Sequence, residues 1–250
     1  MKKRLDQRVV DLGLAPTKTK AQELIETGAV EIFSREKWSV VAKPSQAISD
    51  ETLVRLRDNK LLKFVSRSGL KLEACVKKLD ISVAGCNALD IGISTGGFSD
   101  MLLQAGAASV IGVDVASDQL DKHLAKNSRL TFLPKVNARD LRSVDALRGK
   151  VFDLVVIDVS FISIEKILPE AFHFLKSQGI ILALIKPQFE VGKRELNKSG
   201  VVKTLAATAK ALERIQAAAQ KIGYTGLQTV ESELKGRDGN QEYFLYANKP

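Results

Sequence analysis

The sequence predicts an α/β protein in which a doubly wound, mostly parallel sheet of seven strands follows a small α/β unit. Three observations support this prediction. Apolar strand-like segments alternate with helical segments from Asn87 onward, and the last two strand-like segments have no helix between them. The first sixty or so residues carry their own short helices and strands, and a chain of 250 residues is long enough for both parts.

The first unit begins with two expected helices. Apolar residues at helical spacing predict a helix over 5–12, which Gly13 ends, and Thr17 is placed to cap a second helix that Gly28 ends. Short strands are expected over 29–33, 38–41 and 52–56. The polar residues 34–37 form the turn between the first two of these strands.

The second part is read as alternating strands and helices. Its parallel strands are expected over 87–91, 109–114, 130–133, 152–158 and 179–186. Its helices are expected over 97–105, 118–126, 164–175 and 205–222. Two final strands, over 223–233 and 242–247, are joined only by a polar loop, so they imply an antiparallel hairpin.

The two parts are expected to meet in a basic segment. Between Lys60 and Lys78 the chain carries six basic residues and a single acid, Glu73. We therefore expect domains at 1–59 and 81–250, with 60–80 as a basic linker that also begins the second domain. A solvated helix face is the simpler interpretation of the same charges.

Bulk properties limit the class of partner. The net charge is +9 and the pI is about 9.5, which favours a polyanionic partner, either nucleic acid or an anionic membrane surface. The longest apolar stretch, 179–185, is far shorter than the ~20 residues that span a bilayer, so we expect no membrane insertion and a cytoplasmic location. Cys75 and Cys86 are expected to be free thiols, and the two histidines lack partners at metal-ligand spacing, so no metal is expected.

A glycine-rich loop after the first parallel strand is the expected cofactor site. Glycines let the backbone approach a ligand closely, and the following helix presents unpaired N–H groups. Ser94 stands where the dinucleotide fingerprint has its second glycine, which favours S-adenosylmethionine over NAD. The loop residues expected to bind the cofactor are Asp90, Gly92, Ser94, Thr95, Gly96, Gly97 and Phe98.

Further cofactor contacts are expected at the ends of later strands. Asp114 ends the second parallel strand, where a carboxylate accepts both hydroxyls of an adenosine ribose, and this fits either cofactor. Asn137 follows the third strand and is expected near the adenine edge. Asp158, at the end of the fourth strand, is assigned to the cofactor site as well as to the chemistry.

Asp158 and Lys186 end two strands that are expected to be neighbours. Ligands of open α/β sheets lie beyond the carboxyl ends of the strands, so both side chains should meet at one crevice. A lysine held there needs a carboxylate partner. Glu242 begins the last strand and Lys71 precedes the first; taken alone, each is as readily a surface charge.

A resemblance joins these residues. The segments 65–72, 89–98, 158–163, 186–191 and 239–244 together resemble the TlyA family, in order and spacing along nearly the whole chain. The resemblance implies a Rossmann-like, FtsJ-like methyltransferase domain that uses S-adenosylmethionine to methylate the 2′-oxygen of ribosomal RNA, at cytidine. It also implies a catalytic tetrad of Lys71, Asp158, Lys186 and Glu242. Ser68-Gly69-Leu70 departs from the family pattern but leaves Lys71 in place.

The expected chemistry is removal of a ribose hydroxyl proton during in-line attack on a sulfonium methyl group. We assign Lys186 as the general base in its neutral form, Lys71 as a nearby positive charge, and the two acids as residues that hold the lysines. A carboxylate too close to Lys186 would favour its charged form, and the sequence leaves open which effect dominates.

The first unit resembles the small RNA-binding domain of ribosomal protein S4. The resemblance implies that Arg4, Lys18 and Lys20 contact RNA phosphates, and Arg67 in the basic segment is assigned with them. Lys20 stands where the family usually has arginine, so its contact would lack bidentate geometry. Ribosomal RNA and ribosomal subunits are the expected partners.

Three alternatives remain. The haemolysin label of some family members and the basic charge suggest a membrane-active protein, although no amphipathic or spanning segment is found. A non-catalytic RNA-binding assembly factor on the same scaffold is a second alternative, against which the intact tetrad argues. An NAD-dependent oxidoreductase is the third, and it lacks the expected glycine.

Overall fold

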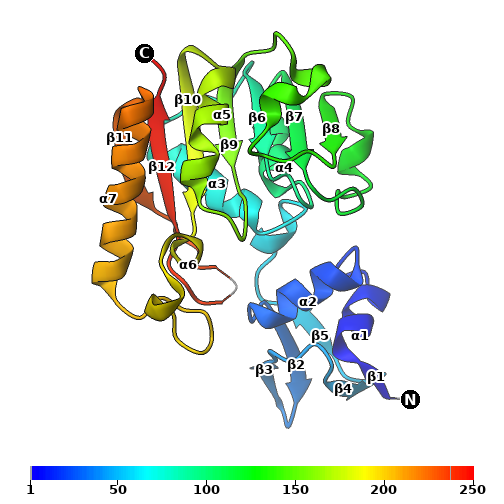
Figure 1. Ribbon diagram of the computed structural model, residues 1–250. Helices are drawn as coiled ribbons and strands as arrows, with labels where there is room; N and C mark the ends of the chain where they lie inside the picture. The colour runs from blue at the N-terminus through cyan, green and yellow to red at the C-terminus, as the bar shows by residue number, and fades with distance from the viewer. Residues whose placement is uncertain (1, 237) are drawn as a thin grey trace. The chain divides into compact units, whose positions relative to one another are not determined.

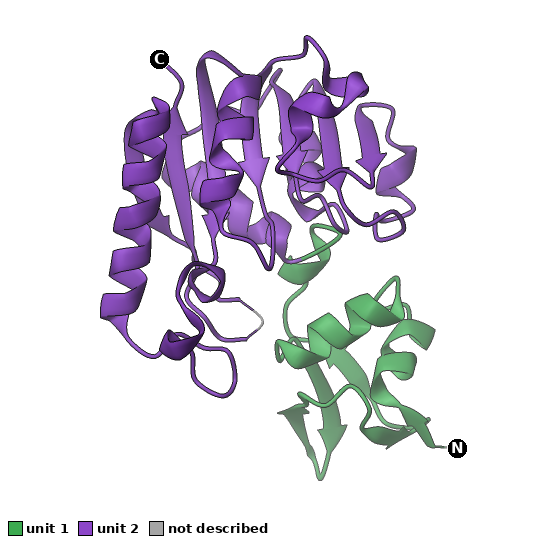
Figure 2. Cartoon of the chain, in the orientation of Figure 1, with its two compact units in different colours: residues 1–66 green, residues 67–250 purple. Residues whose placement is uncertain are grey.

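The computed structural model describes residues 2–236 and 238–250 in two compact units, residues 1–66 and 67–250 (Figure 2). The division falls inside the basic segment expected over 60–80. One part of that segment is the short 3₁₀ helix η1 (Lys60–Leu62) of unit 1, and the other is the helix α3 (Ser68–Lys78) of unit 2. The assignment of unit 1 to RNA binding stays a prediction.

Unit 1 combines two helices with a small antiparallel sheet. The expected capping is confirmed: the Thr17 side chain accepts the Lys20 N–H at 3.1 Å, and Gly28 has a φ of +74° just after the second helix. The helices are α1 (Leu5–Asp11) and α2 (Lys18–Glu26). The sheet has the order β3-β2-β5, from β2 (Val30–Ser34), β3 (Lys37–Val40) and β5 (Val54–Leu56). The separate pair β1 (Lys2–Arg4) and β4 (Ala47–Ser49) was not expected.

The core of unit 1 lies between the helices and one face of this sheet. Leu5 and Leu24 from the helices are fully buried and belong to one apolar cluster with Val30 and Ile32 of β2. Because side chains alternate along a strand, Glu31 and Phe33 point to the opposite face. The sheet of unit 1 therefore has one buried and one outward face.

Unit 2 contains the seven-stranded sheet that the sequence predicts, in the order β11-β12-β10-β9-β6-β7-β8. The strands β8, β7, β6, β9 and β10 are parallel, and β12 runs antiparallel to both β10 and β11, which confirms the terminal hairpin. The bounds are β6 (Asn87–Ile91), β7 (Ser109–Asp114), β8 (Leu130–Pro134), β9 (Phe152–Ile157), β10 (Leu175–Ile185), β11 (Thr225–Glu231) and β12 (Tyr243–Asn248).

Helices cover both faces of the sheet: in Figure 1, α5 and α7 lie in front of it, and α3 and α4 behind it. This doubly wound arrangement confirms the expected fold class. The remaining helices of unit 2 are α4 (Gly97–Gln104), α5 (Leu168–Phe174), α6 (Pro187–Glu190) and α7 (Leu205–Ile222). The 3₁₀ turns are η2 (Leu124–Lys126), η3 (Leu141–Ser143), η4 (Asp145–Leu147), η5 (Ile164–Lys166) and η6 (Lys193–Glu195).

The helix expected over 118–126 is wrong, because only the single turn η2 forms there. The Asp121 carboxylate accepts the backbone N–H groups of His123 at 2.8 Å and Leu124 at 3.1 Å. A side chain that takes these donors offers the backbone an alternative to a regular helix. The segment therefore forms a loop held by hydrogen bonds to the Asp121 carboxylate.

Candidate active site

The candidate site lies at one edge of the seven-stranded sheet. The parallel strands β6, β7, β9 and β10 have their carboxyl ends at this edge, and antiparallel β12 begins there. Ile185 pairs with Tyr243, so Lys186 directly follows this pair on one strand and Glu242 directly precedes it on the other. The topology therefore gathers residues that are far apart in the sequence.

Lys186 and Asp158 form an ion pair, with 2.7 Å between Nζ and Oδ1. Lys186 Nζ also donates to Ser160 Oγ at 2.9 Å. The side chains of the ion pair are 14% and 18% exposed, so the pair is held in place but still reached by solvent. The expected meeting of the two strand-end side chains is present.

Lys71 and Glu242 form a second, more deeply buried ion pair. Lys71 reaches from α3 to place Nζ 2.5 Å from Glu242 Oε2, and the two side chains are only 6% and 3% exposed. Backbone packs closely against this carboxylate, because a Cβ added to Gly236 would lie 2.6 Å from Glu242 Oε1. The structure thus arranges the four expected catalytic residues as two lysine–carboxylate pairs.

The glycine loop between β6 and α4 makes two close backbone approaches. Gly92 has a φ of +89°, and an added Cβ would lie 2.7 Å from the backbone oxygen of Asp158. Gly96, with a φ of +97°, is the N-cap of α4, and an added Cβ would lie 2.2 Å from Leu124 Cδ2. Only glycine fits this turn, which brings the loop against the end of β9.

Asp90 is fully buried at the start of this loop. Its Oδ2 accepts the hydroxyl of Ser99 at 2.6 Å and the Ser99 N–H at 3.1 Å, whereas Oδ1 has no hydrogen-bond partner among the described residues. Burial raises the pKa of Asp90 to about 7. A buried acceptor left without a donor is costly, so the site favours a ligand that supplies one.

Asp114 ends β7 beside the loop. Its two carboxylate oxygens accept the N–H groups of Ser94 at 2.8 Å and Ala116 at 2.9 Å. These bonds orient the half-buried carboxylate and leave further lone pairs for ribose hydroxyls. Asn137 is exposed. The N–H of the preceding residue, Val136, donates to the backbone oxygen of Asp114 at 2.9 Å, so the backbone of Asn137 lies at the same edge.

The remaining loop residues differ in what they offer a ligand. Thr95 is half-buried, and its backbone oxygen accepts the Asp121 N–H at 3.2 Å; Gly97 is buried at the start of α4. Phe98 is 2% exposed and stacks on Phe244, with 6.0 Å between ring centroids. This burial argues against the expected cofactor contact by the Phe98 side chain, which instead packs against Phe244 inside unit 2.

An exposed aromatic residue near the ion pair was not singled out from the sequence. Phe161 follows Ser160, is 90% exposed, has a φ of +65° and packs against Phe189, with 5.0 Å between centroids. A phenylalanine right after the end of a strand, at the edge where ligands bind, was the available signal. A positive φ is uncommon for a phenylalanine, so the backbone at this position is strained.

A buried carboxylate ties together the segments that carry these residues. Glu190 is 6% exposed; it accepts the N–H of Ile164 at 2.9 Å, and its Oε2 lies 3.4 Å from a guanidinium nitrogen of Arg214 in α7. Arg214 also pairs with Glu165. Burial raises the pKa of Glu190. The chain after β9 is therefore fixed to the chain after β10.

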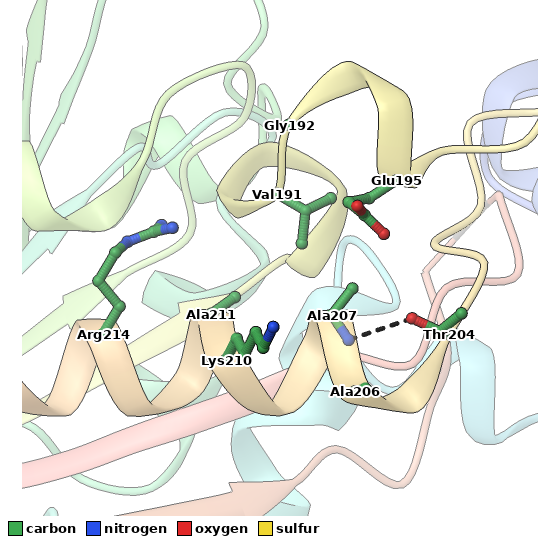
Figure 3. Close-up of a pocket in the computed structure, with 9 residues that line it drawn as sticks. All are labelled: Val191, Gly192, Glu195, Thr204, Ala206, Ala207, Lys210, Ala211 and Arg214. Carbon is green, nitrogen blue, oxygen red and sulfur yellow. Dashed lines mark hydrogen bonds between the residues drawn. The ribbon is translucent and has the colours of Figure 1, made fainter.

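A separate pocket lies between the segment after α6 and the first turns of α7 (Figure 3). The dashed line in Figure 3 is the N-cap bond, in which the Thr204 hydroxyl accepts the Ala207 N–H at 3.2 Å. The lining residues are Val191, Gly192, Glu195, Thr204, Ala206, Ala207, Lys210, Ala211 and Arg214. No residue expected at the active site is among them.

The residues expected to bind RNA differ in accessibility. Lys20 is a correction: it is 6% exposed, pairs with Glu23 at 2.9 Å and donates to the Phe64 oxygen at 3.2 Å, so its charge is used inside unit 1. Arg4 is 49% exposed and bidentate to Asp6, at 3.0 and 2.7 Å; this guanidinium lowers the pKa of Asp6 to about 2. Lys18 is exposed and Arg67 half-buried.

The described residues offer neither a metal centre nor a membrane-spanning helix. Within residues 2–236 and 238–250, no group of three or more His, Cys, Asp or Glu side chains is arranged to hold a metal ion. Across the same residues, no helix has the length and apolar character needed to cross a membrane.

Comparison with known proteins adds four findings. The FtsJ-like methyltransferase family matches residues 64–249. The 16S/23S rRNA (cytidine-2′-O)-methyltransferase TlyA of Mycobacterium tuberculosis is 38% identical over 97% of this chain and 88% of that protein. A solved structure from Streptococcus thermophilus with a hemolysin name is 35% identical, with a TM-score of 0.76 over 99% of this chain and 88% of that one. An S-adenosylmethionine-dependent methyltransferase from Mesorhizobium loti, 12% identical with a TM-score of 0.52 over 73% and 99% of the two chains, shares the fold.

Proposed function

This chain belongs to the TlyA family of FtsJ-like methyltransferases, and on that premise we propose that it methylates the 2′-oxygen of a cytidine ribose in ribosomal RNA. The observation that carries the proposal is the sheet edge that holds the glycine loop after β6. One lysine–carboxylate pair there follows β9 and β10, and the second links α3 to the start of β12. Ribosomal subunits are the proposed partners, and such a substrate implies a cytoplasmic reaction.

The proposed cofactor is S-adenosylmethionine, which supplies an electrophilic methyl group on a sulfonium when bound. The residues present fit this group. The backbone of Gly92 and Gly96 would form the cradle, and Asp114 would accept hydrogen bonds from the ribose hydroxyls. The free Oδ1 acceptor of Asp90 suits the positively charged amino acid end of the molecule. Ser94, Thr95 and Gly97 complete the loop, and Asn137 is kept as the proposed adenine contact.

Lys186 is the proposed general base. Its amine lies at the sheet edge between Asp158 and Ser160, which fix its direction through contacts of 2.7 and 2.9 Å. Removing the ribose proton requires the neutral amine, so Lys186 must first pass a proton to solvent. Its partial exposure permits that exchange.

Lys71 and Glu242 are proposed to orient the reacting hydroxyl and supply fixed charge. Their mutual contact in a nearly dry environment keeps both side chains in one geometry. Phe161, exposed beside Ser160, offers a ring on which the target base can stack once it leaves its helix. Arg4, Lys18 and Arg67 remain the proposed phosphate contacts.

The test is methyl transfer from tritiated S-adenosylmethionine to isolated ribosomal subunits, followed by mapping of the labelled nucleotide. Lys186→Ala should abolish transfer while cofactor and RNA binding stay near normal. A matched control exists at the other end of the same strands, where Lys176 of β10 pairs with Asp153 of β9 at 2.7 Å. Lys176→Ala should retain activity. Turnover by Lys186→Ala would exclude it as the base, and label on a nucleobase would refute the reaction.

The hemolysin name of the Streptococcus thermophilus relative defines a competing activity. Leakage of dye from anionic vesicles at the protein concentrations that support methylation would favour it. The Lys186→Ala protein separates the two activities, because a base in the methyl-transfer site has no role in membrane lysis.

A further inference from the structure

The outward face of the sheet β3-β2-β5 in unit 1 carries an aromatic and basic surface. We define this outer face by six side chains that register and alternation place on one side: Glu31, Phe33, Trp38, Val40, Leu53 and Arg55. Phe33 pairs directly with Trp38, and Glu31 pairs with both Val40 and Arg55. The opposite face, with Val30 and Ile32, belongs to the core of unit 1.

The outer face exposes apolar side chains where an ordinary strand would present polar ones. Phe33 is 38% exposed, Val40 47% and Leu53 60%. Exposed apolar side chains scattered singly need no explanation, but a contiguous group on one small sheet indicates an interaction surface.

Trp38 and Arg55 form a stacked pair at the centre of this surface. The Arg55 guanidinium lies 4.0 Å from the centroid of a Trp38 ring, and the Phe33 and Trp38 ring centroids are 5.4 Å apart. Arg55 remains 50% exposed. Aromatic rings and a guanidinium plane together are the groups on which unpaired nucleotide bases stack.

The charge of the surrounding residues favours a polyanion over an apolar protein patch. The outer face and its borders carry three basic residues against two acids, and one of those acids, Glu31, already lies 2.9 Å from Arg55 and 3.7 Å from Arg57. The basic residues are Arg35, Arg55 and Arg57.

We propose that the outer face is an RNA-binding surface of unit 1, on which an unpaired nucleotide stacks against the Trp38–Arg55 pair while neighbouring phosphates contact the basic residues. The proposal rests on the proposed function only in taking RNA as the substrate. It adds a contact that recognises single-stranded RNA to the phosphate contacts proposed for Arg4 and Lys18.

The chain provides its own probe, because Trp38 is its single tryptophan. Full-length protein is titrated with oligoadenylate at low salt while tryptophan emission is followed, and binding is measured in parallel by the anisotropy of labelled RNA. We expect quenching that follows the binding curve and weakens as salt rises. Trp38→Ala should weaken binding about tenfold or more, and Trp38→Phe should restore most of the affinity. Leu205→Ala, at an 84% exposed apolar position on α7, is the matched control and should bind as the unaltered protein does.

Methylation assays separate this proposal from the proposed function. Trp38→Ala should raise the KM for ribosomal subunits and leave kcat unchanged. Unchanged emission at saturating RNA, or equal affinity of Trp38→Ala, would overturn the surface even if methylation is found. Emission that responds to intact subunits but not to naked RNA would also overturn it, in favour of a protein partner. Quenching without any methylation would instead count against the proposed function alone.

Discussion

The buried pair of Lys71 and Glu242 gives the sharpest stability prediction. Replacing one member, by Lys71→Met or Glu242→Leu, leaves a charge without a partner in a site where both side chains are at most 6% exposed. Such a change should lower the free energy of unfolding by about 3–5 kcal/mol. The double substitution removes both charges, so its loss should be far smaller than either single loss.

These energies correspond to readily measured shifts. For a unit of this size, about 3–5 kcal/mol lowers the melting temperature by about 6–20 °C. Differential scanning calorimetry of the full chain records the unfolding transitions. The transition whose melting temperature rises on addition of S-adenosylhomocysteine is that of unit 2. Unfolding of unit 1 is followed separately by the emission of Trp38, and the midpoint of that transition should be the same in the variants.

The exposed pair of Lys176 and Asp153 is the control. Its side chains are 39% and 34% exposed, so Lys176→Met should change the free energy of unfolding by at most about 1 kcal/mol. If Lys71→Met and Glu242→Leu each lower the free energy of unfolding by less than about 1 kcal/mol, the Lys71–Glu242 pair is hydrated in solution. A double variant as unstable as the sum of the singles would show that the two residues do not interact.

Three further predictions concern the loop, its buried acid and unit 1. Gly92→Ala should prevent cofactor binding in isothermal titration, because its Cβ would lie 2.7 Å from the Asp158 oxygen and its φ is +89°; normal affinity would refute the close approach. For Asp90, burial raises the folded-state pKa from 3.8 to about 7, so its contribution should destabilise the fold progressively as pH rises across that interval. Asp90→Asn should remove this slope from urea unfolding measured against pH, and an unchanged slope would contradict it. The double substitution Arg4→Gln and Lys18→Gln should weaken RNA binding. It should also reduce the slope of the logarithm of the binding constant against the logarithm of salt concentration by about two at most, whereas an identical slope would exclude both residues as phosphate contacts.

Patterns local to the chain predicted the elements well where a cap or a strand end marks them. The bounds of β6, β7 and α7 coincide with the expected ranges, because Asp114 and the pair Thr204 and Gly223 punctuate the apolar periodicity. The segment 118–126 has the composition of a helix, but hydrogen bonds to the Asp121 carboxylate hold it as a loop. Composition alone does not reveal that competition.

The site was only partly predictable because its contacts depend on topology. Asp158 and Lys186 end adjacent strands, so their meeting follows from the alternation of strands and helices. The contact of Lys71 with Glu242 joins a helix before the sheet to its last antiparallel strand, and only a resemblance linked them in the sequence. Lys20 shows a different limit of sequence-based prediction. A basic residue near the start of a helix suggests a phosphate contact, but in the structure Lys20 is buried and paired with Glu23, three residues further along the chain.

The two ion pairs are chemically similar but unequal in their access to solvent, and this difference supports the different roles proposed for them. A general base must release a proton to water before each turnover, so it has to be reachable. Lys186, with its side chain 14% exposed, meets this condition, whereas Lys71, at 6% and in contact with a 3% exposed carboxylate, does not. A charged group that water does not reach instead interacts more strongly with neighbouring charges and exchanges protons with solvent less readily. On the proposed function, we therefore expect proton transfer at the pair that follows β9 and β10, and electrostatic orientation by the pair that links α3 to the start of β12.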